Sequence, residues 1–179
     1  MSKQVLVIST SPRKGGNSDT LADEFVRGAQ EAGNNVEKIA LYDHTIGFCK
    51  GCLACQKTQR CVIHDDADTI AQKMLTADIL VFATPIYYYG ICGQMKTMLD
   101  RANPLFSADY QFRNVYLLAA AAEENEHTAD GAVTALQGWI DCFEKSRLSG
   151  IIFAGGVTSV GDIRNHPALK KAYEMGRTV

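Results

Sequence analysis

Residues 4–18 read QVLVISTSPRKGGNS and join an apolar stretch to a loop of small, polar and basic residues. The first seven residues are largely apolar and rich in β-branched side chains, which is typical of a strand buried on both faces. Asn17 and Ser18 can then cap a helix, whose apolar residues recur on one face from Leu21 to Ala29. A buried strand, a polar loop and an amphipathic helix predict the first unit of a layered α/β fold.

The alternation of strand and helix continues along the chain. Further strands are expected at residues 36–41, 79–84, 115–121 and 151–154, and further helices at residues 65–75, 93–102, 133–143 and from Pro167 onward. Buried strands separated by helices indicate a parallel sheet with helices on both faces. Five strands fit the doubly wound order 2-1-3-4-5, and we expect one domain over residues 1–179.

Charge and hydropathy exclude several classes of function. The net charge of −2 over 179 residues gives no basic surface for nucleic acid or an anionic membrane. No apolar run approaches the length of a membrane span, and the short apolar stretch after Lys3 is unlike a signal peptide. We therefore expect a cytoplasmic protein with neither nucleic acid nor membrane as a partner.

The loop at residues 9–18 has the composition of an anion-binding site. It lies between the first strand and the first helix, where doubly wound sheets bind ligands and where free helical N–H groups attract anions. Asn17 stands where the P-loop pattern requires lysine, and no G-x-G-x-x-G fingerprint is present. The loop therefore suits a phosphate monoester held by hydroxyls, amides and Arg13 without a metal ion. The alternative is a solvated loop with ordinary helix capping.

Three consecutive tyrosines, residues 87–89, follow the third strand. Alternate side chains of a strand face opposite sides, so burial in the core cannot explain all three. Tyrosine suits stacking on a flat heterocycle, Pro85 stiffens the loop and Gly90 allows close approach of the backbone. The alternative is a surface aromatic patch or a subunit interface. Because the first and third strands should be neighbours, we expect this loop to meet the loop at residues 9–18.

Four of the six cysteines, at positions 49, 52, 55 and 61, form the pattern C-x2-C-x2-C-x5-C. The close triple spacing is similar to the ligand run of bacterial ferredoxins, although the fourth interval is longer and no proline follows. Iron–sulfur ligands, a zinc site and a turn-rich loop with buried thiols all stay open at this point. Cys92 and Cys142 are expected to be small buried apolar residues.

Together these segments resemble the NADPH-dependent FMN reductase and iron–sulfur flavoprotein group of the flavodoxin-like superfamily. The motifs that carry the resemblance are STSPRKGGNS at 9–18, CKGCLAC at 49–55, Cys61 with Asp65-Asp66, and ATPIYYYG at 83–90. The resemblance implies a flavodoxin-like fold and an FMN-dependent NAD(P)H oxidoreductase. It implies that the FMN phosphate is held by Ser9, Ser11, Arg13, Asn17 and Ser18, and that the isoalloxazine ring is lined by Pro85, Ile86, Tyr87, Tyr88 and Gly90.

The resemblance also bears on the cysteines, the partners and the assembly. Iron–sulfur flavoproteins would bind a [4Fe–4S] cluster through Cys49, Cys52, Cys55 and Cys61, whereas reductases of the same group carry similar cysteines without a cluster. A nicotinamide cofactor would be the electron donor, a small molecule or a protein the acceptor, and the chain a homodimer or homotetramer. No catalytic side chain is expected, because the flavin carries the chemistry.

Two alternatives to a reductase stay open: an iron–sulfur flavoprotein that acts as an electron-transfer partner, and a non-enzymatic module that senses phosphate or a nucleotide. Several polar residues are given structural roles. Asp65 and Asp66 are expected to cap a helix, and Arg101 is expected on a helix surface. The acidic stretch at residues 123–126 is expected to be a solvated loop, and the alternative is that it forms the rim of the flavin pocket.

Overall fold

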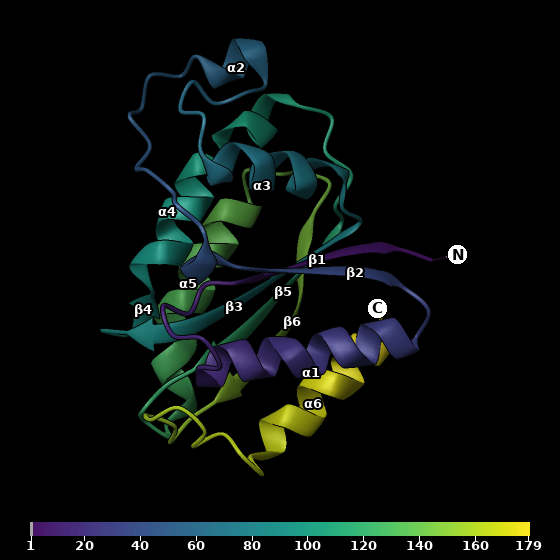
Figure 1. The fold of residues 1–179 in the computed structure, drawn as a ribbon, viewed down its shortest axis with the longest axis vertical. Coiled ribbons are helices and arrows are strands. Elements are labelled where there is room, and N and C mark those ends of the chain that lie inside the picture. Colours follow the sequence, from purple (N-terminus) through teal and green to yellow (C-terminus); the bar gives the residue numbers. More distant parts are fainter. Residues whose placement is uncertain (1) are drawn as a thin grey trace.

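A parallel sheet lies at the centre of the computed structural model, which describes residues 2–179 (Figure 1). The long strands are β1 (Gln4–Ser9), β2 (Asn35–Ala40), β3 (Ile79–Tyr87), β5 (Asn114–Ala120) and β6 (Arg147–Ala154), in the spatial order β2-β1-β3-β5-β6. The short β4 (Gly90–Ile91) pairs antiparallel with the end of β3. Since β5 and β6 are the fourth and fifth long strands, the doubly wound order expected from the sequence is confirmed.

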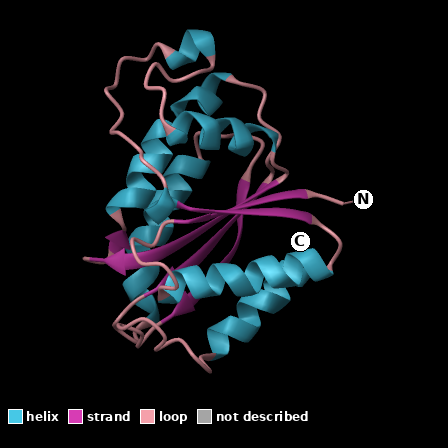
Figure 2. Cartoon of the chain, in the orientation of Figure 1, coloured by secondary structure: helices cyan, strands magenta, loops and turns pink. Residues whose placement is uncertain are grey.

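Helices cover both faces of the sheet, as Figures 1 and 2 show. One face is covered by α1 (Asn17–Glu31) and α6 (Pro167–Arg177), and the other by α3 (Asp66–Thr76), α4 (Gly93–Arg101) and α5 (Asp130–Ile140). Shorter pieces are α2 (Cys55–Thr58) and the 3₁₀ turns η1 (Leu41–Asp43), η2 (Asn103–Ser107) and η3 (Glu126–Ala129). None of the helices within residues 2–179 is long and apolar enough to cross a membrane.

The two apolar layers explain why β1 and β3 are apolar over most of their length. In β1, Leu6 and Ile8 pack with the layer under α3 to α5, whereas Val5 and Val7 pack with the layer under α1 and α6. Successive side chains of a strand face opposite sides, so each strand supplies both layers. The expectation of one domain stays a prediction, and residue 1 lies outside the described residues.

Helices α1 and α6 approach each other unusually closely because each carries a glycine at the contact. A Cβ atom on Gly28 would lie 2.0 Å from the carbonyl oxygen of Tyr173, and one on Gly176 would lie 2.2 Å from that of Phe25. Real Cβ atoms do not approach so closely, so only glycine fits at these two positions. The contact fixes α6 over the apolar layer that α1 covers.

The strand ends differ from the sequence-based boundaries in ways that matter for function. β3 continues past Thr84 to Tyr87, because its later residues pair with β4 and Pro85 lies opposite Ala120. The cysteine segment contains the short helix α2, and β6 begins at Arg147 rather than at residue 151. The hairpin of β3 and β4 was not anticipated from the sequence.

Candidate functional site

The loop after β1 begins beside the later part of β3. Ser9 pairs with Ala83 in the sheet register, and the N–H of Thr10 donates to the carbonyl of Ala83 at 2.8 Å. A cleft of about 380 Å³ opens at this edge, within the range of small-molecule sites. It is lined by Ser11, Pro12, Arg13, Asn17, Ser18, Pro85, Ile86, Tyr87, Ala120, Ala121, Ala122, Val157 and Thr158. The polar loop and the tyrosine loop therefore meet at one cleft.

Hydrogen bonds within the first loop hold it in a tight turn. The hydroxyl of Ser11 accepts from the N–H of Arg13 at 3.1 Å and donates to its carbonyl at 2.9 Å. Gly15 has a φ of +64°, and a Cβ on Gly16 would lie 2.6 Å from the Ser11 hydroxyl. The two glycines are therefore needed for the turn, and Ser11 shapes the loop in addition to lining the cleft.

Asn17 is held by another part of the chain. Its side-chain N–H group donates to the carbonyl of Ser159 at 3.0 Å, and its side-chain oxygen accepts from the N–H of Ile163 at 3.4 Å. These bonds bring in the segment after β6, whose Val157 and Thr158 form a wall of the cleft. Sequence reasoning missed this wall, since no motif marks the segment.

Ser18 presents a buried hydroxyl without a hydrogen-bond partner among the described residues. It is 1% exposed, lies in the first turn of α1 and lines the cleft. A buried hydroxyl is normally paired, so an unpaired one at a helix N-terminus suits an anionic ligand. Arg13 is exposed beside it, whereas Ser9 is fully buried and does not line the cleft.

The tyrosines divide into three different environments. Tyr87 lines the cleft and is 43% exposed, whereas Tyr88 is fully exposed at the tip of the β3–β4 hairpin. The hydroxyl of Tyr89 donates to a carboxylate oxygen of Glu123 at 2.7 Å. Tyr88 and Tyr89 have φ values of 48° and 60°, as a two-residue hairpin turn requires. The turn carries Tyr88 and Gly90 away from the lining of the cleft.

The loop after β5 contributes a further side of the cleft. Ala121 and Ala122 line it, and Glu123 accepts from Tyr89 and, at 3.4 Å, from the hydroxyl of Thr128. The first residue of the acidic stretch is therefore fastened to the hairpin rather than free in solvent. Gly131 allows this packing, because a Cβ there would lie 2.1 Å from the carbonyl of Tyr89.

Cys92 lies buried beneath the cleft, as expected from the sequence. Its sulfur is 3.2 Å from the hydroxyl of Thr10, and its N–H donates to the hydroxyl of Thr84 at 3.4 Å. Thr10 and Thr84 belong to the segments that follow β1 and form the later part of β3. Cys92 thus bonds to both segments, through its thiol to Thr10 and through its backbone N–H to Thr84.

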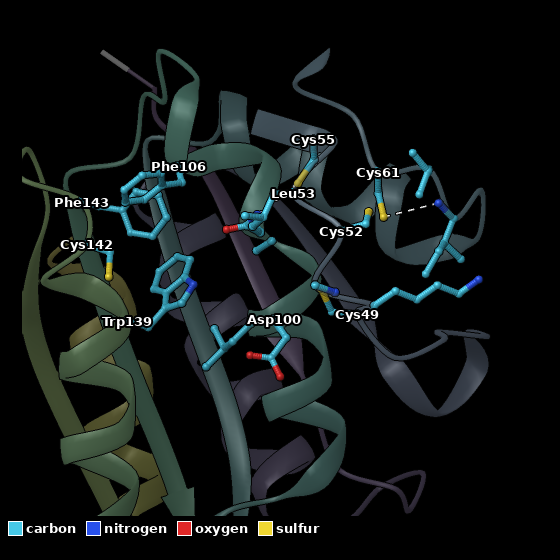
Figure 3. A pocket seen from close by; sticks show the side chains of 17 residues that line it. Cys49, Cys52, Leu53, Cys55, Cys61, Asp100, Phe106, Trp139, Cys142 and Phe143 are labelled. Atoms are coloured by element: carbon cyan, nitrogen blue, oxygen red, sulfur yellow. Dashed lines mark hydrogen bonds between the residues drawn. The ribbon is translucent and has the colours of Figure 1, made fainter. Parts of the chain in front are cut away.

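A second cavity, of about 410 Å³, contains the cysteine quartet (Figure 3). Its lining includes Cys49, Cys52, Cys55 and Cys61, together with Cys142 and the aromatic residues Phe106, Trp139 and Phe143. In Figure 3 the quartet lies on one side and Cys142 lies beside Trp139 on the other. Cys142 is exposed, so the expectation that it is buried is wrong: it follows the end of α5, where the chain turns at the surface.

Three of the four quartet sulfurs accept a hydrogen bond from nitrogen. Cys55 accepts from the side chain of Asn103 at 3.1 Å, Cys49 from the N–H of Gly51 at 3.4 Å, and Cys61 from the N–H of Ile63 at 3.5 Å. Within residues 2–179, no group of three or more His, Cys, Asp or Glu side chains is close enough together to hold a metal ion. The structure therefore places the quartet at one cavity without gathering it into a metal site.

Arg101 of α4 holds the cysteine segment, residues 47–63, by hydrogen bonds at both of its ends. It is 1% exposed, which contradicts the expectation of a helix-surface residue. Its guanidinium donates to both carboxylate oxygens of Asp65 at 2.7 Å, to the carbonyl of Gly47 at 2.7 Å and to that of Ile63 at 2.9 Å. Gly47 and Ile63 lie on either side of the quartet in sequence, so one buried side chain holds both ends of the segment.

Asp65 combines this ion pair with the expected helix cap. One of its oxygens accepts from the N–H of Ala67 at 3.1 Å, at the start of α3, and the other accepts from the N–H of Gly47 at 2.8 Å. Burial raises the pKa of Asp65, but the hydrogen bonds from Arg101 and Gly47 outweigh burial and leave the pKa below its usual value. The carboxylate is therefore charged wherever the pair is intact.

Comparison with known proteins decides the family. The chain matches the model of the NADPH-dependent FMN reductase family over residues 4–154, which include all the strands of the sheet. The chain belongs to this family. The resemblance inferred from the motifs is thereby confirmed, and so is the flavodoxin-like fold.

Individual relatives agree with this assignment. An iron–sulfur flavoprotein of Methanocaldococcus jannaschii is 38% identical over 111 residues, which cover 62% of this chain and 57% of that protein. An iron–sulfur flavoprotein of Methanosarcina thermophila is 28% identical over 162 residues, covering 90% and 82% of the two chains. The structure of an NAD(P)H:quinone oxidoreductase from Methanothermobacter marburgensis aligns with a TM-score of 0.77 and 17% identity, covering 99% and 96%, which shows the shared fold.

Proposed function

We propose that this chain is an NAD(P)H oxidoreductase that binds FMN in the cleft at the ends of β1, β3 and β5. The main support is the unpaired, buried hydroxyl of Ser18, a residue that lines the same cleft as Pro85 and Ile86 of β3. A phosphate has the oxygens that such a hydroxyl and the helix N-terminus favour. When bound, FMN would accept a hydride from the nicotinamide cofactor and pass electrons on to an acceptor.

The residues of the cleft then divide into two groups. Ser11, Arg13, Asn17 and Ser18 would surround the phosphate, with Ser9 supporting the loop from beneath. Pro85, Ile86 and Tyr87 would line the ring, with Tyr88 and Gly90 forming the turn that positions Tyr87. These side chains bind, orient and shield the flavin; the proposal assigns none of them a proton transfer.

The partners follow from the same proposal. A nicotinamide cofactor would approach the exposed side of the ring, and a small molecule or a protein would take the electrons. Assembly into a homodimer or homotetramer is proposed from the resemblance alone. Light scattering on the purified protein measures it directly.

Absorption spectroscopy tests the proposed function. Anaerobically purified protein should show the bands of bound flavin, and NADH or NADPH should bleach them. Ser18→Ala should raise the Kd of FMN about tenfold to a hundredfold, because it removes a hydrogen bond to a charged group. Ser107→Ala, on the exposed η2 turn, is the matched control. A colourless protein without affinity for FMN would contradict the proposal and favour the sensing module.

A second function, electron transfer through a [4Fe–4S] cluster, is favoured by one specific observation. All four quartet thiols line one cavity with an apolar, aromatic wall, and N–H groups already reach three of the sulfurs. Such hydrogen bonds and such surroundings stabilise clusters and tune their potentials. Cys49, Cys52, Cys55 and Cys61 would have to draw closer together to bind one.

Reconstitution with iron and sulfide tests this second function. Wild-type protein should gain acid-labile sulfide, and Cys52→Ser should lose it, whereas Cys142→Ser, in the same cavity but outside the quartet, should retain it. Trp139 is the only tryptophan of the chain and lines the cavity, so its fluorescence should fall as the cluster forms. Equal sulfide content in the wild type and both variants would show that the quartet does not bind a cluster.

A further inference from the structure

A buried carboxylate lies beside the loop that we assign to the FMN phosphate. Asp19 follows Ser18 in the first turn of α1 and is 3% exposed. One of its oxygens accepts from the N–H of Gly15 at 3.0 Å. A fixed negative charge next to a site for a dianion is unfavourable unless something compensates it. The proposed site therefore requires a cation near Asp19.

Lys38 of β2 supplies that cation from beneath the loop. Its ammonium nitrogen lies 2.7 Å from one oxygen of Asp19 and 2.6 Å from one oxygen of Asp23. The side chain of Lys38 is only 20% exposed, whereas that of Asp23 is 58% exposed. Burial acts against charge on both members of the inner pair, yet hydrogen bonding between them leaves the pKa of Asp19 lowered and that of Lys38 raised. Asp19 and Lys38 thus form an ion pair in which the carboxylate is buried and the ammonium is partly buried.

The same carboxylate fixes the shape of the loop. Gly15 has a φ of +64°, in the left-handed region, and nothing lies within 4 Å of the place where its Cβ would be. Steric crowding therefore does not impose this conformation, and the bond from Gly15 to Asp19 is the contact that stabilises it. With the Gly15 N–H bound to Asp19, the hydroxyl of Ser18 is the buried side-chain group lining the cleft that has no partner among the described residues.

We propose that Asp19 and Lys38 are positioning residues that make the cleft selective for a flavin carrying a phosphate. Asp19 holds the loop in its anion-binding shape, and Lys38 cancels the charge that would otherwise repel the phosphate. The inference rests on the proposed FMN site and concerns only the phosphate end of the ligand. Riboflavin has the same ring as FMN but no phosphate. Comparing the two ligands therefore distinguishes effects on phosphate binding from effects on ring binding.

Binding of FMN and of riboflavin, each followed by the quenching of flavin fluorescence, tests the inference. Two unit charges that lie about 12 Å apart interact by about 1.4 kcal/mol at an effective dielectric constant of about 20, which changes a binding constant about tenfold. Lys38→Met should therefore raise the Kd of FMN by about tenfold or more and leave that of riboflavin within about twofold. Lys73→Met, which removes an ammonium paired with Glu37 on the exposed surface, is the matched control and should change neither.

The double variant Asp19→Asn/Lys38→Met removes both charges and provides a second test, which does not depend on how well the single variant folds. Asparagine retains an oxygen for the N–H of Gly15 and carries no charge, so FMN affinity should return to within about threefold of the wild type. If Lys38→Met weakened the binding of FMN and of riboflavin equally, or weakened neither, the inference would be overturned. A wild-type protein that binds neither flavin would instead overturn the proposed function on which it rests.

Discussion

Arg101 illustrates how a single buried side chain can organise a functional segment. The two terminal nitrogens of the Arg101 guanidinium donate to two carboxylate and two carbonyl oxygens, whereas Nε has no partner among the described residues. The carbonyl partners, Gly47 and Ile63, lie on either side of the quartet in sequence. Removing one member of a buried ion pair leaves the other uncompensated, which typically costs about 3–5 kcal/mol. The conformation of the cysteine segment therefore depends on a residue of α4 that bonds to both ends of the segment and to the N-cap of α3.

The pH dependence of stability should reveal this ion pair. Because the folded-state pKa of Asp65 lies below its usual value of 3.8, the unfolded chain binds the proton more readily. The stability from Asp65 is therefore complete above pH values near 4 and is lost as the pH falls through the depressed pKa. Asp65→Asn should be less stable than wild type at pH 7, and the difference should shrink by pH 3.

Urea unfolding of both proteins at pH 7, 5 and 3 measures this difference. Asp66→Asn is the control, since Asp66 also lies at the start of α3 but is not bonded to Arg101. A difference between wild type and Asp65→Asn that stays constant over this range would show that the carboxylate charge does not contribute.

For single residues, the sequence predicted which residue types gather at the cleft but not where each side chain points. Asn17 is engaged with Ser159 and Ile163, which lie more than a hundred residues away, so no local pattern could reveal this role. Tyr88 points away because a two-residue turn determines its backbone, and that turn depends on pairing with β4. The burial of Arg101 could not be predicted either, because helical spacing alone does not identify its distant partner Asp65.

Among the elements, the crossing of α1 and α6 depends most directly on residue size. Alanine normally stabilises a helix relative to glycine by about 0.5–1 kcal/mol. Gly28→Ala should do the reverse and destabilise the protein by about 1–3 kcal/mol or more, because its Cβ would meet the backbone of Tyr173 at 2.0 Å. Thermal and urea unfolding measure the sign as well as the size of the effect.

Gly138→Ala is the matched control for this prediction. Gly138 is also helical, in α5, and a Cβ there would meet nothing within 4 Å. This variant should be slightly more stable than wild type. If both alanine variants stabilise the protein, the close approach of α1 and α6 does not exist in solution.

The long elements were predictable because each carries a strong periodic signal, and the short ones were not. β1 and β3 are apolar throughout, and α1 has a continuous apolar face, so their order along the chain predicted the sheet topology. β4 has two residues and α2 has four, too few for any period to appear. These two elements are the ones that place the tyrosine hairpin and the cysteine segment.

For the molecule as a whole, the arrangement of the two cavities is the main structural result. They share no lining residue, and α4 runs from the hairpin toward the cysteine segment, as Figure 1 shows. Nine residues of α-helix span about 13 Å. Changes at the quartet should therefore leave the flavin cleft intact: the Cys52→Ser variant is expected to retain FMN with an unchanged Kd even where it loses sulfide.

The fully exposed ring of Tyr88 has a consequence for the behaviour of the protein in concentrated solution. The φ of Tyr88 lies in the left-handed region, which bulky residues seldom adopt, and the hairpin turn holds the aromatic side chain exposed at its tip. Such a rigid aromatic tip makes contact with a neighbouring surface inexpensive in conformational entropy. Crowding or salting-out is therefore expected to bring molecules together first through this tip.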